Sequence, residues 1–460
     1  MLEIYRKDDY RNPHYRNRHY NLRMLKFYNR EQEIALLERC GQKALETAQM
    51  TFVTGRRRIG KTALLTKVFN GKPSLYFFVE KKNEALLCAE FTEEIQDKLG
   101  VTVYGEIRAF KKLFGYLMDL SKTRPFTLIM DEFQEFMNIN PAVYSEMQHV
   151  WDQGKDGSKI HLVCCGSIYS LMNKIFQNAK EPLFGRATAR LHVKQFDIPT
   201  LKEILRDHAP GFSNEDLLAF YLFTGGVAKY VELLAGAGAF TMEKIVDEIF
   251  FANSLFLDEG RNTLIDEFGK DYGNYFSILM LIASSKTSRP EMESIMGASL
   301  GGFLDRLENE FGLIAKQRPI LAKPGTKNVK YRINDNFLNF WFRFVYKHRG
   351  AVETGNFDYL KTLVQRDYKT YSGLVLERYF REKIAQEENV SQIGSYWETG
   401  NQNEIDIVVL NEYEKTAVIA EVKRQKENIS LNALKCKAVK LAGQLAGWQI
   451  EYRACSMDEM

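Results

Sequence analysis

The octapeptide Gly55-Arg-Arg-Arg-Ile-Gly-Lys-Thr62 constrains the fold more than any other part of this sequence. A Gly-x-x-x-x-Gly-Lys-Thr pattern needs a flexible loop between a strand and a helix, so that backbone N–H groups and the helix dipole converge on phosphates. Here an apolar run over 51–54 precedes it and a helical pattern over 63–69 follows it. We therefore predict a nucleotide-binding loop in which Lys61 neutralises β/γ-phosphate charge and the Thr62 hydroxyl ligates Mg²⁺. The residues expected around the nucleotide are Gly55, Arg56, Arg57, Arg58, Ile59, Gly60, Lys61, Thr62, Ala63 and, from further along the chain, Ser167.

Short apolar runs alternate with amphipathic stretches between residues 27 and 200. Such runs are typical of buried parallel strands, and the rhythm predicts an α/β fold whose parallel sheet is joined by crossover helices. The predicted strands cover 50–54, 74–79, 127–130 and 161–165.

The 460 residues are too many for one compact core, and further units are expected after this sheet. We predict a basic leader over 1–26, a P-loop ATPase domain over 27–200, and a helical lid over 201–270 that is broken at Gly225-Gly226. A winged helix-turn-helix is predicted over 271–345, from three helical patterns and two extended stretches near 313–320 and 330–333. A second α/β domain over 346–460 has a helix containing Glu377, strands near 393–397, 404–410 and 416–422, and a helix from Leu431.

A second element of the nucleotide site is the apolar run 126–130, which ends in Asp131 and Glu132. We expect Asp131 to hold Mg²⁺, directly or in its outer shell, and Glu132 to polarise the attacking water. The alternative is that the two acids cap the following helix.

Two further polar residues complete this prediction. Ser167 follows the strand 161–165, where it would sense the γ-phosphate, or else cap a helix. Arg186, on a turn within 182–190, would stabilise γ-phosphate charge in the same chain or across a subunit interface, or else be a structural surface arginine. No Asn-Lys-x-Asp guanine reader follows Asn173-Lys174, so ATP is preferred to GTP.

Composition narrows the setting. Hydrophobic residues make up 45% of the chain and charged residues 27%, which is ordinary for a globular protein. The net charge of +4 equals the excess in the leader, which would grip phosphates or be a solvated terminus. The six cysteines form no CxxC pair, so neither a zinc site nor a disulfide framework is indicated. No apolar run approaches bilayer length and no secretory signal is evident, so we expect a cytoplasmic protein with no membrane partner.

The motifs resemble a known family. Phe27-Tyr-Asn-Arg-Glu-Gln-Glu33, the arginine-rich loop, Met-Asp-Glu, Phe-Gly-Arg and Phe-Thr-Gly-Gly are similar to those of the archaeal-type ATPases, AAA-like members of the signal-transduction ATPase group. The likeness covers 27 to about 235 and implies ATP and Mg²⁺ as cofactors. It departs at Val227-Ala228, where relatives often have a proline.

The C-terminal region offers a second set of catalytic candidates. Asp406 lies in a predicted strand, and Glu421 and Lys423 share one face of another. If the strands pair, Asp406 and Glu421 can share Mg²⁺ while Lys423 orients or activates the hydrolytic water, with Glu377 completing the acid set. Cross-strand charge pairing on a surface is the alternative.

The same region resembles a domain of unknown function related to the PD-(D/E)xK nucleases, on the strength of Tyr331-Arg-Ile-Asn-Asp-Asn-Phe-Leu-Asn-Phe-Trp-Phe-Arg343 and Glu404-Ile-Asp-Ile-Val. This implies a restriction-endonuclease-like fold. Five cations nearby would form a basic edge for phosphates or a solvated helix face: Arg424, Lys426, Lys435, Lys437 and Lys440. The expected recognition helix of the winged helix, 299–310, is acidic, which favours a structural or relay role over DNA reading.

Together these features predict an Mg²⁺-dependent ATPase that couples nucleotide turnover to a nuclease-like domain acting on nucleic acid, with DNA the expected substrate and a homo-oligomer one expected state. The alternative is a non-catalytic signalling protein in which the nucleotide controls partner binding and the C-terminal domain only docks.

Overall fold

The computed structural model describes residues 26–460, apart from the side chain of Asp266. The basic leader predicted over 1–26 therefore lies outside the described residues except for Lys26. That lysine forms an ion pair with Glu203.

A five-stranded parallel sheet forms the first half of the described chain, with strand order β2-β3-β4-β1-β5. The four predicted strands are confirmed. Strand β5 falls partly where we expected only a turn, because it has four residues and no continuous apolar run. The strands are β1 (Gln49–Thr54), β2 (Ser74–Phe78), β3 (Phe126–Asp131), β4 (Ile160–Cys165) and β5 (Ala189–His192).

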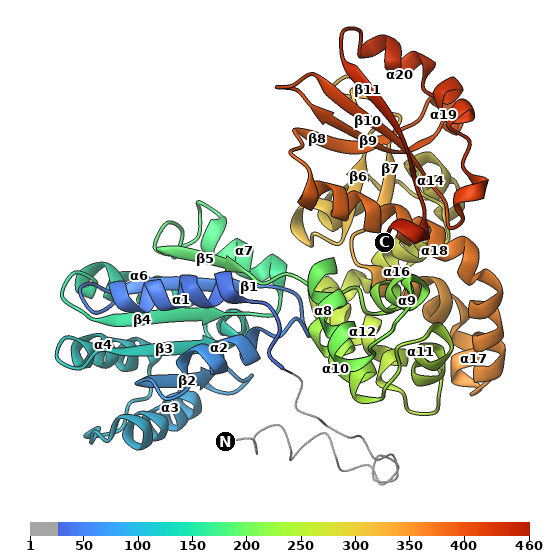
Figure 1. Cartoon of the computed structure of the whole chain (residues 1–460). Helices are drawn as coiled ribbons and strands as arrows, with labels where there is room; N and C mark the ends of the chain where they lie inside the picture. The colour runs from blue at the N-terminus through green and yellow to red at the C-terminus, as the bar shows by residue number, and fades with distance from the viewer. Residues whose placement is uncertain (1–25) are drawn as a thin grey trace.

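Helices cover both faces of this sheet (Figure 1). Alternate residues of β1 belong to different cores: Met50 and Phe52 face one side and Val53 the other. The Met50 side is covered by α3 (Glu84–Leu99), α4 (Phe110–Ser121), α5 (Phe136–Ile139), α6 (Ala142–Gly154) and α7 (Tyr169–Gln177). The Val53 side is covered by α1 (Glu31–Lys43) and α2 (Lys61–Phe69).

The helical segment expected after the sheet has five helices: α8 (Ile198–His208), α9 (Asn214–Thr224), α10 (Ala228–Gly236), α11 (Met242–Ile249) and α12 (Leu255–Phe268). The Gly225-Gly226 break between α9 and α10 has a steric cause. Both glycines have positive φ, and a Cβ on Gly226 would lie 2.2 Å from the carbonyl oxygen of Phe196. The Gly226 carbonyl in turn accepts a hydrogen bond from the Phe196 N–H at 2.8 Å.

The next segment has three helices followed by two antiparallel strands, the order that a winged helix would have. They are α13 (Tyr272–Ala283), α14 (Arg289–Met296), α15 (Gly301–Asp305), β6 (Ile314–Gln317) and β7 (Lys330–Ile333). The expected recognition helix is a short α15 that continues as a π-helical turn, Arg306–Glu310. Arg306 forms an ion pair with Glu310 at 2.8 Å. The winged-helix assignment stays a prediction.

The C-terminal domain is a four-stranded sheet built around one long helix. Its strand order is β11-β10-β9-β8, with only the β10–β11 pair parallel. The strand β11 was not predicted. The elements are α16 (Asn336–Phe340), α17 (Arg349–Glu353), α18 (Phe357–Glu387), β8 (Gln392–Tyr396), β9 (Ile405–Asn411), β10 (Thr416–Val422), α19 (Leu431–Lys437), α20 (Val439–Gln444) and β11 (Gln449–Cys455).

One hydrophobic core joins the two halves. It runs from Leu64 of α2, through the helical segment and α18, to Ile407 of β9. Figure 1 shows α8 and α9 lying between the parallel sheet and the C-terminal elements. Over the described residues, no helix combines the length and the apolar character that crossing a bilayer requires.

Candidate nucleotide site and C-terminal acid cluster

The predicted phosphate-binding loop lies between the end of β1 and the start of α2. Gly55 has φ of 153°, and a Cβ there would lie 2.6 Å from the Val193 carbonyl oxygen, so only glycine fits. Gly60 has φ of 91° and is the N-cap of α2, with no side chain capping the helix. The first N–H groups of α2 are thus available to an anion.

Lys61 lies inside this loop. Its ammonium donates hydrogen bonds to the carbonyls of Gly55, at 2.8 Å, and Arg56, at 3.0 Å. The residue is only 7% exposed. A buried cation held by two carbonyls of the loop suits a phosphate.

Thr62 and Asp131 meet at the carboxyl ends of the strands. The Thr62 hydroxyl donates to Asp131 Oδ2 at 3.0 Å, and the Tyr76 hydroxyl donates to the same oxygen. The backbone N–H of Glu132 holds the other carboxylate oxygen at 2.9 Å. These oxygens are the ligands that Mg²⁺ prefers, and they fit a Mg²⁺–ATP complex seated on the loop.

Tyr76 was missed by sequence analysis, since nothing in the pattern of β2 marks it. Burial first, and the charge of Asp131 second, raise the pKa of the Tyr76 phenol. The phenol therefore stays protonated and remains a donor to Asp131.

Glu132 is held by two neighbouring side chains. Its Oε2 accepts a hydrogen bond from the Ser167 hydroxyl at 2.7 Å and another from the Gln134 amide. Glu132 is the N-cap of the short helical turn Phe133–Glu135, but its side chain makes no cap hydrogen bond, and Ile168 rather than Ser167 is the N-cap of α7. Glu132 also has a left-handed backbone, with φ of 52°, which costs roughly 1–3 kcal/mol and is typical of functional positions.

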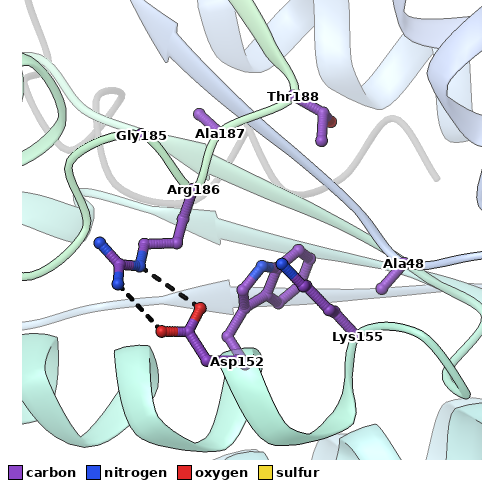
Figure 2. Close-up of a pocket in the computed structure, with 8 residues that line it drawn as sticks. Ala48, Asp152, Lys155, Gly185, Arg186, Ala187 and Thr188 are labelled. Atoms are coloured by element: carbon purple, nitrogen blue, oxygen red, sulfur yellow. Dashed lines mark hydrogen bonds and ion pairs between the residues drawn. The ribbon is translucent and has the colours of Figure 1, made fainter.

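Arg186 lies at the opposite edge of the sheet. Figure 2 shows it pointing toward Asp152 in a pocket between the 185–188 loop and α6, and its Nη2 donates to Asp152 Oδ2 at 2.9 Å. The Thr188 N–H bonds the Met50 carbonyl at the amino end of β1, whereas the phosphate-binding loop follows the carboxyl end. Arg186 therefore does not reach the loop of its own chain. Its ion pair with Asp152 is what the structural alternative predicts, and a role across a subunit interface stays a prediction.

The remaining predicted loop residues lie in different surroundings. Ile59 is buried and Ala63 is exposed. Arg56, Arg57 and Arg58 each donate to residues of the second half of the chain. Where relatives often have proline after the glycine pair, the Lys229 N–H donates to the Arg58 carbonyl at 3.1 Å, so α10 contacts the loop without it.

In the C-terminal domain, the four predicted residues lie close together. Strands β9 and β10 pair up to Ile407–Ala420, and one step further this register sets Asp406 opposite Glu421. Asp406 Oδ2 accepts a hydrogen bond from the Val422 N–H at 2.8 Å. The Lys423 ammonium lies 3.1 Å from Glu421 and 3.7 Å from Asp406.

Glu377, on α18, faces the same cluster. Burial first, and the charge of Asp406 second, raise the pKa of Glu377 to about 8. Burial also raises the pKa of Asp406. Two carboxyl groups that resist ionisation are the expected result of placing acids together in an apolar setting.

A lysine that was not among the predicted site residues changes the reading of this cluster. The Lys437 ammonium lies 3.0 and 3.2 Å from the two carboxylate oxygens of Glu421. Glu421 is thus occupied by cations, and nowhere in residues 26–460 are three His, Cys, Asp or Glu side chains arranged to hold a metal ion. Only the ion pair of Lys423 with Asp406, at 3.7 Å, joins the two strand segments, and metal binding by this cluster stays a prediction.

Most of the predicted basic edge is also paired. Lys426 bonds Glu459, Lys440 bonds Glu398, and Arg424 bonds Glu215. Lys435 lies over the Tyr452 ring. The six cysteines are free in this structure.

Comparison with known proteins agrees with this geometry. Residues 27–234 match the family described as an ATPase domain predominantly from Archaea. The chain carries an archaeal-type ATPase domain. Residues 341–438 match a family described as archaeal and bacterial proteins of unknown function.

Known proteins are similar to the chain over much of its length. An uncharacterized protein of Methanocaldococcus jannaschii, MJECL04, is 27% identical over 408 residues, which cover 86% of this chain and 87% of that protein. The Walker-type ATPase PABY2304 of Pyrococcus abyssi is similar in structure, with a TM-score of 0.53 at 18% identity over 69% of this chain and 96% of that one. The ORC2 protein of Aeropyrum pernix gives 0.46 at 13% identity, covering 73% of this chain and 98% of that one. The first of these structures supports the P-loop ATPase fold.

Proposed function

We propose that the chain hydrolyses ATP with Mg²⁺. The hydrogen bond from Thr62 to Asp131, beside the buried Lys61, carries this proposal. Lys61 and Thr62 begin α2 and Asp131 ends β3, so two separate elements bring a cation and hard oxygen ligands to one place. Mg²⁺ would be held by Thr62 and Asp131 and would supply charge neutralisation at the β- and γ-phosphates.

The roles of the chain's own groups follow from their positions. The loop N–H groups and Lys61 bind the β- and γ-phosphates. Glu132 orients a water whose oxygen bonds to the γ-phosphorus as the bond from that phosphorus to the β–γ bridging oxygen breaks, and its carboxylate accepts the proton of that water. Ser167 and Gln134 fix the direction of the Glu132 carboxylate.

The test compares wild type with Lys61→Ala and Glu132→Gln in nucleotide binding and phosphate release. We expect the first variant to lose nucleotide binding, because the loop loses its cation. We expect the second to bind ATP but turn it over about 10²–10⁴-fold more slowly. Equal turnover by all three proteins would exclude hydrolysis at this site.

We further propose that the C-terminal domain is nuclease-like and acts on nucleic acid, with DNA the favoured substrate. The gathering of Glu377, Asp406, Glu421 and Lys423 supports it. The test is cleavage of DNA and RNA with Mg²⁺ or Mn²⁺ by wild type, Asp406→Ala and Lys423→Ala. Cleavage that neither change affects would assign the activity elsewhere.

A specific observation favours a rival function. Lys437 and Lys423 neutralise Glu421, which is what a docking domain without metal chemistry would have. On that reading the nucleotide controls partner binding and the C-terminal domain only docks. Absence of Mn²⁺ binding by the wild-type chain would favour the rival.

A further inference from the structure

Three consecutive arginines of the phosphate-binding loop reach three places in the second half of the chain. Arg56 Nη1 donates to Asp335 Oδ2 at 3.0 Å, and its Nη2 donates to the Gly312 carbonyl at 3.2 Å. Arg57 donates to the Asn262 carbonyl at 2.9 Å. Arg58 donates to both carboxylate oxygens of Glu259, at 3.0 and 3.3 Å. The acceptors lie beyond residue 234, where the match to the ATPase family ends.

The two acids are fixed by their own surroundings. Asp335 is 4% exposed, and its other oxygen caps α16 by accepting from the Leu338 N–H at 2.8 Å. Glu259 is 3% exposed and also accepts from the Tyr230 hydroxyl at 3.1 Å. Buried acids held in this way are rigid anchors, because each has a partner that is independent of the arginine.

The loop needs anchoring. Arg58 has a left-handed backbone, with φ of 70°, which a residue other than glycine adopts only when its surroundings impose it. Its side chain is bonded to Glu259 and its carbonyl to the Lys229 N–H. With the guanidinium groups engaged outside the loop, the side that faces the phosphates is lined by backbone N–H groups and Lys61.

We propose that Asp335 and Glu259 are positioning residues for the nucleotide site, holding the phosphate-binding loop in its binding conformation through Arg56 and Arg58. The proposal rests on ATP binding at this loop. When an anchor is lost, the loop spends a smaller fraction of its time in the binding conformation. The apparent dissociation constant equals the intrinsic constant divided by that fraction, so it rises. By reciprocity, nucleotide binding strengthens the contact between the loop and the second half of the chain by the same factor.

The test measures MgADP affinity by isothermal titration calorimetry with the full chain. Asp335→Asn removes the charge that faces Arg56, while asparagine keeps the cap on α16. Asp197→Asn is the matched control, because Asp197 likewise caps a helix, α8, through the Thr200 N–H at 3.0 Å, and within residues 26–460 no ion pair to it is seen. We expect about tenfold weaker binding for Asp335→Asn and less than a twofold change for Asp197→Asn.

A double-mutant cycle separates positioning from general destabilisation. If Arg56 and Asp335 act as a pair, Arg56→Gln together with Asp335→Asn weakens binding no more than either change alone, about tenfold. Their effects would multiply if each acted independently, and that result overturns the proposal. Turnover at saturating ATP stays within about twofold of wild type in Asp335→Asn, since Glu132 and Thr62 are untouched, so the effect appears in KM rather than kcat.

Glu259→Gln keeps the test decisive if Asp335→Asn does not fold, because glutamine still accepts from Tyr230. We expect about threefold weaker MgADP binding. Unchanged or tighter binding in both anchor variants, with wild type binding normally, overturns this inference alone. Failure of wild type to bind either nucleotide would instead overturn the proposed ATPase function.

Discussion

The nucleotide site and the C-terminal cluster each gather acids, a lysine and strand ends, yet they differ in what the acids contact. At the nucleotide site Asp131 accepts from hydroxyl and N–H groups, and Lys61 bonds backbone carbonyls instead of an acid. In the C-terminal cluster Lys423 and Lys437 lie directly on Glu421. A carboxylate bonded only by neutral donors can still attract a metal ion. A carboxylate paired with ammonium groups is already neutralised within the protein.

The largest effect expected from this comparison is at Asp131. Asp131→Asn removes the charge that would hold Mg²⁺, so ATP turnover should fall by about 10²–10³-fold. Phosphate release under saturating ATP measures it. The control is Asp152→Asn, which removes the partner of Arg186 at the other end of the sheet. A loss below threefold would show that the charge of Asp131 is not used to hold Mg²⁺, so the two sites would not differ in this way.

Glu377 provides a test of the C-terminal cluster through stability. Its folded pKa of about 8 lies above the ordinary value of 4.5, so the folded state keeps a proton that the unfolded state releases between these values. Stability should therefore fall as pH rises from about 4.5 to 8, by roughly 2–4 kcal/mol. Glu377→Gln should remove this loss.

Chemical denaturation at pH 5 and pH 8.5 measures the effect, with Glu93→Gln on the exposed face of α3 as control. The same pH dependence in wild type and Glu377→Gln would show that Glu377 ionises freely. The acid cluster would then be hydrated, and its carboxylates would resemble those of the nucleotide site more than the structure indicates.

Removing Lys437 should make the C-terminal cluster more like the nucleotide site, because Glu421 would lose one of its cationic partners. Lys437→Met removes one of the cations on Glu421, and we expect Mn²⁺ affinity of the C-terminal cluster to rise about tenfold. Lys435→Met is the control, because Lys435 lies over Tyr452 and not on the acids. Equal Mn²⁺ binding by both variants, measured calorimetrically, would mean that Lys437 does not block a metal.

The smallest effect concerns Ser167. Losing its hydrogen bond to Glu132 in Ser167→Ala should lower kcat about three- to fivefold, since Gln134 still holds the carboxylate. Ser145→Ala on α6 serves as control. A loss above a hundredfold would mean that Ser167 touches the nucleotide itself.

The sequence allowed us to predict the features that are determined by residues adjacent along the chain. The strands β1, β3 and β4 are buried at every position and rich in apolar residues, and the loop motif specifies its own geometry, so their positions could be predicted. Strand β11 was missed because only its last residue, Cys455, is buried and the others are exposed or half-buried, so it has no continuous apolar run.

Contacts between residues that are far apart in the sequence could not be predicted, because no local sequence pattern marks them. Arg56 and Asp335 are 279 residues apart, and Arg58 and Glu259 are 201 apart. Lys437 was expected in a basic edge for phosphates or on a solvated helix face, whereas folding brings it onto Glu421. Arg186 looked like a phosphate contact because order along the chain does not tell which end of a sheet a turn occupies.

The continuous hydrophobic core also has a thermodynamic consequence. Because apolar side chains from α2 to β9 belong to one cluster, separating the two halves would expose a large apolar area to water. The described chain should then melt as a single cooperative unit, rather than half by half. A nucleotide bound at one end would raise the melting temperature of strands at the other end that it never touches.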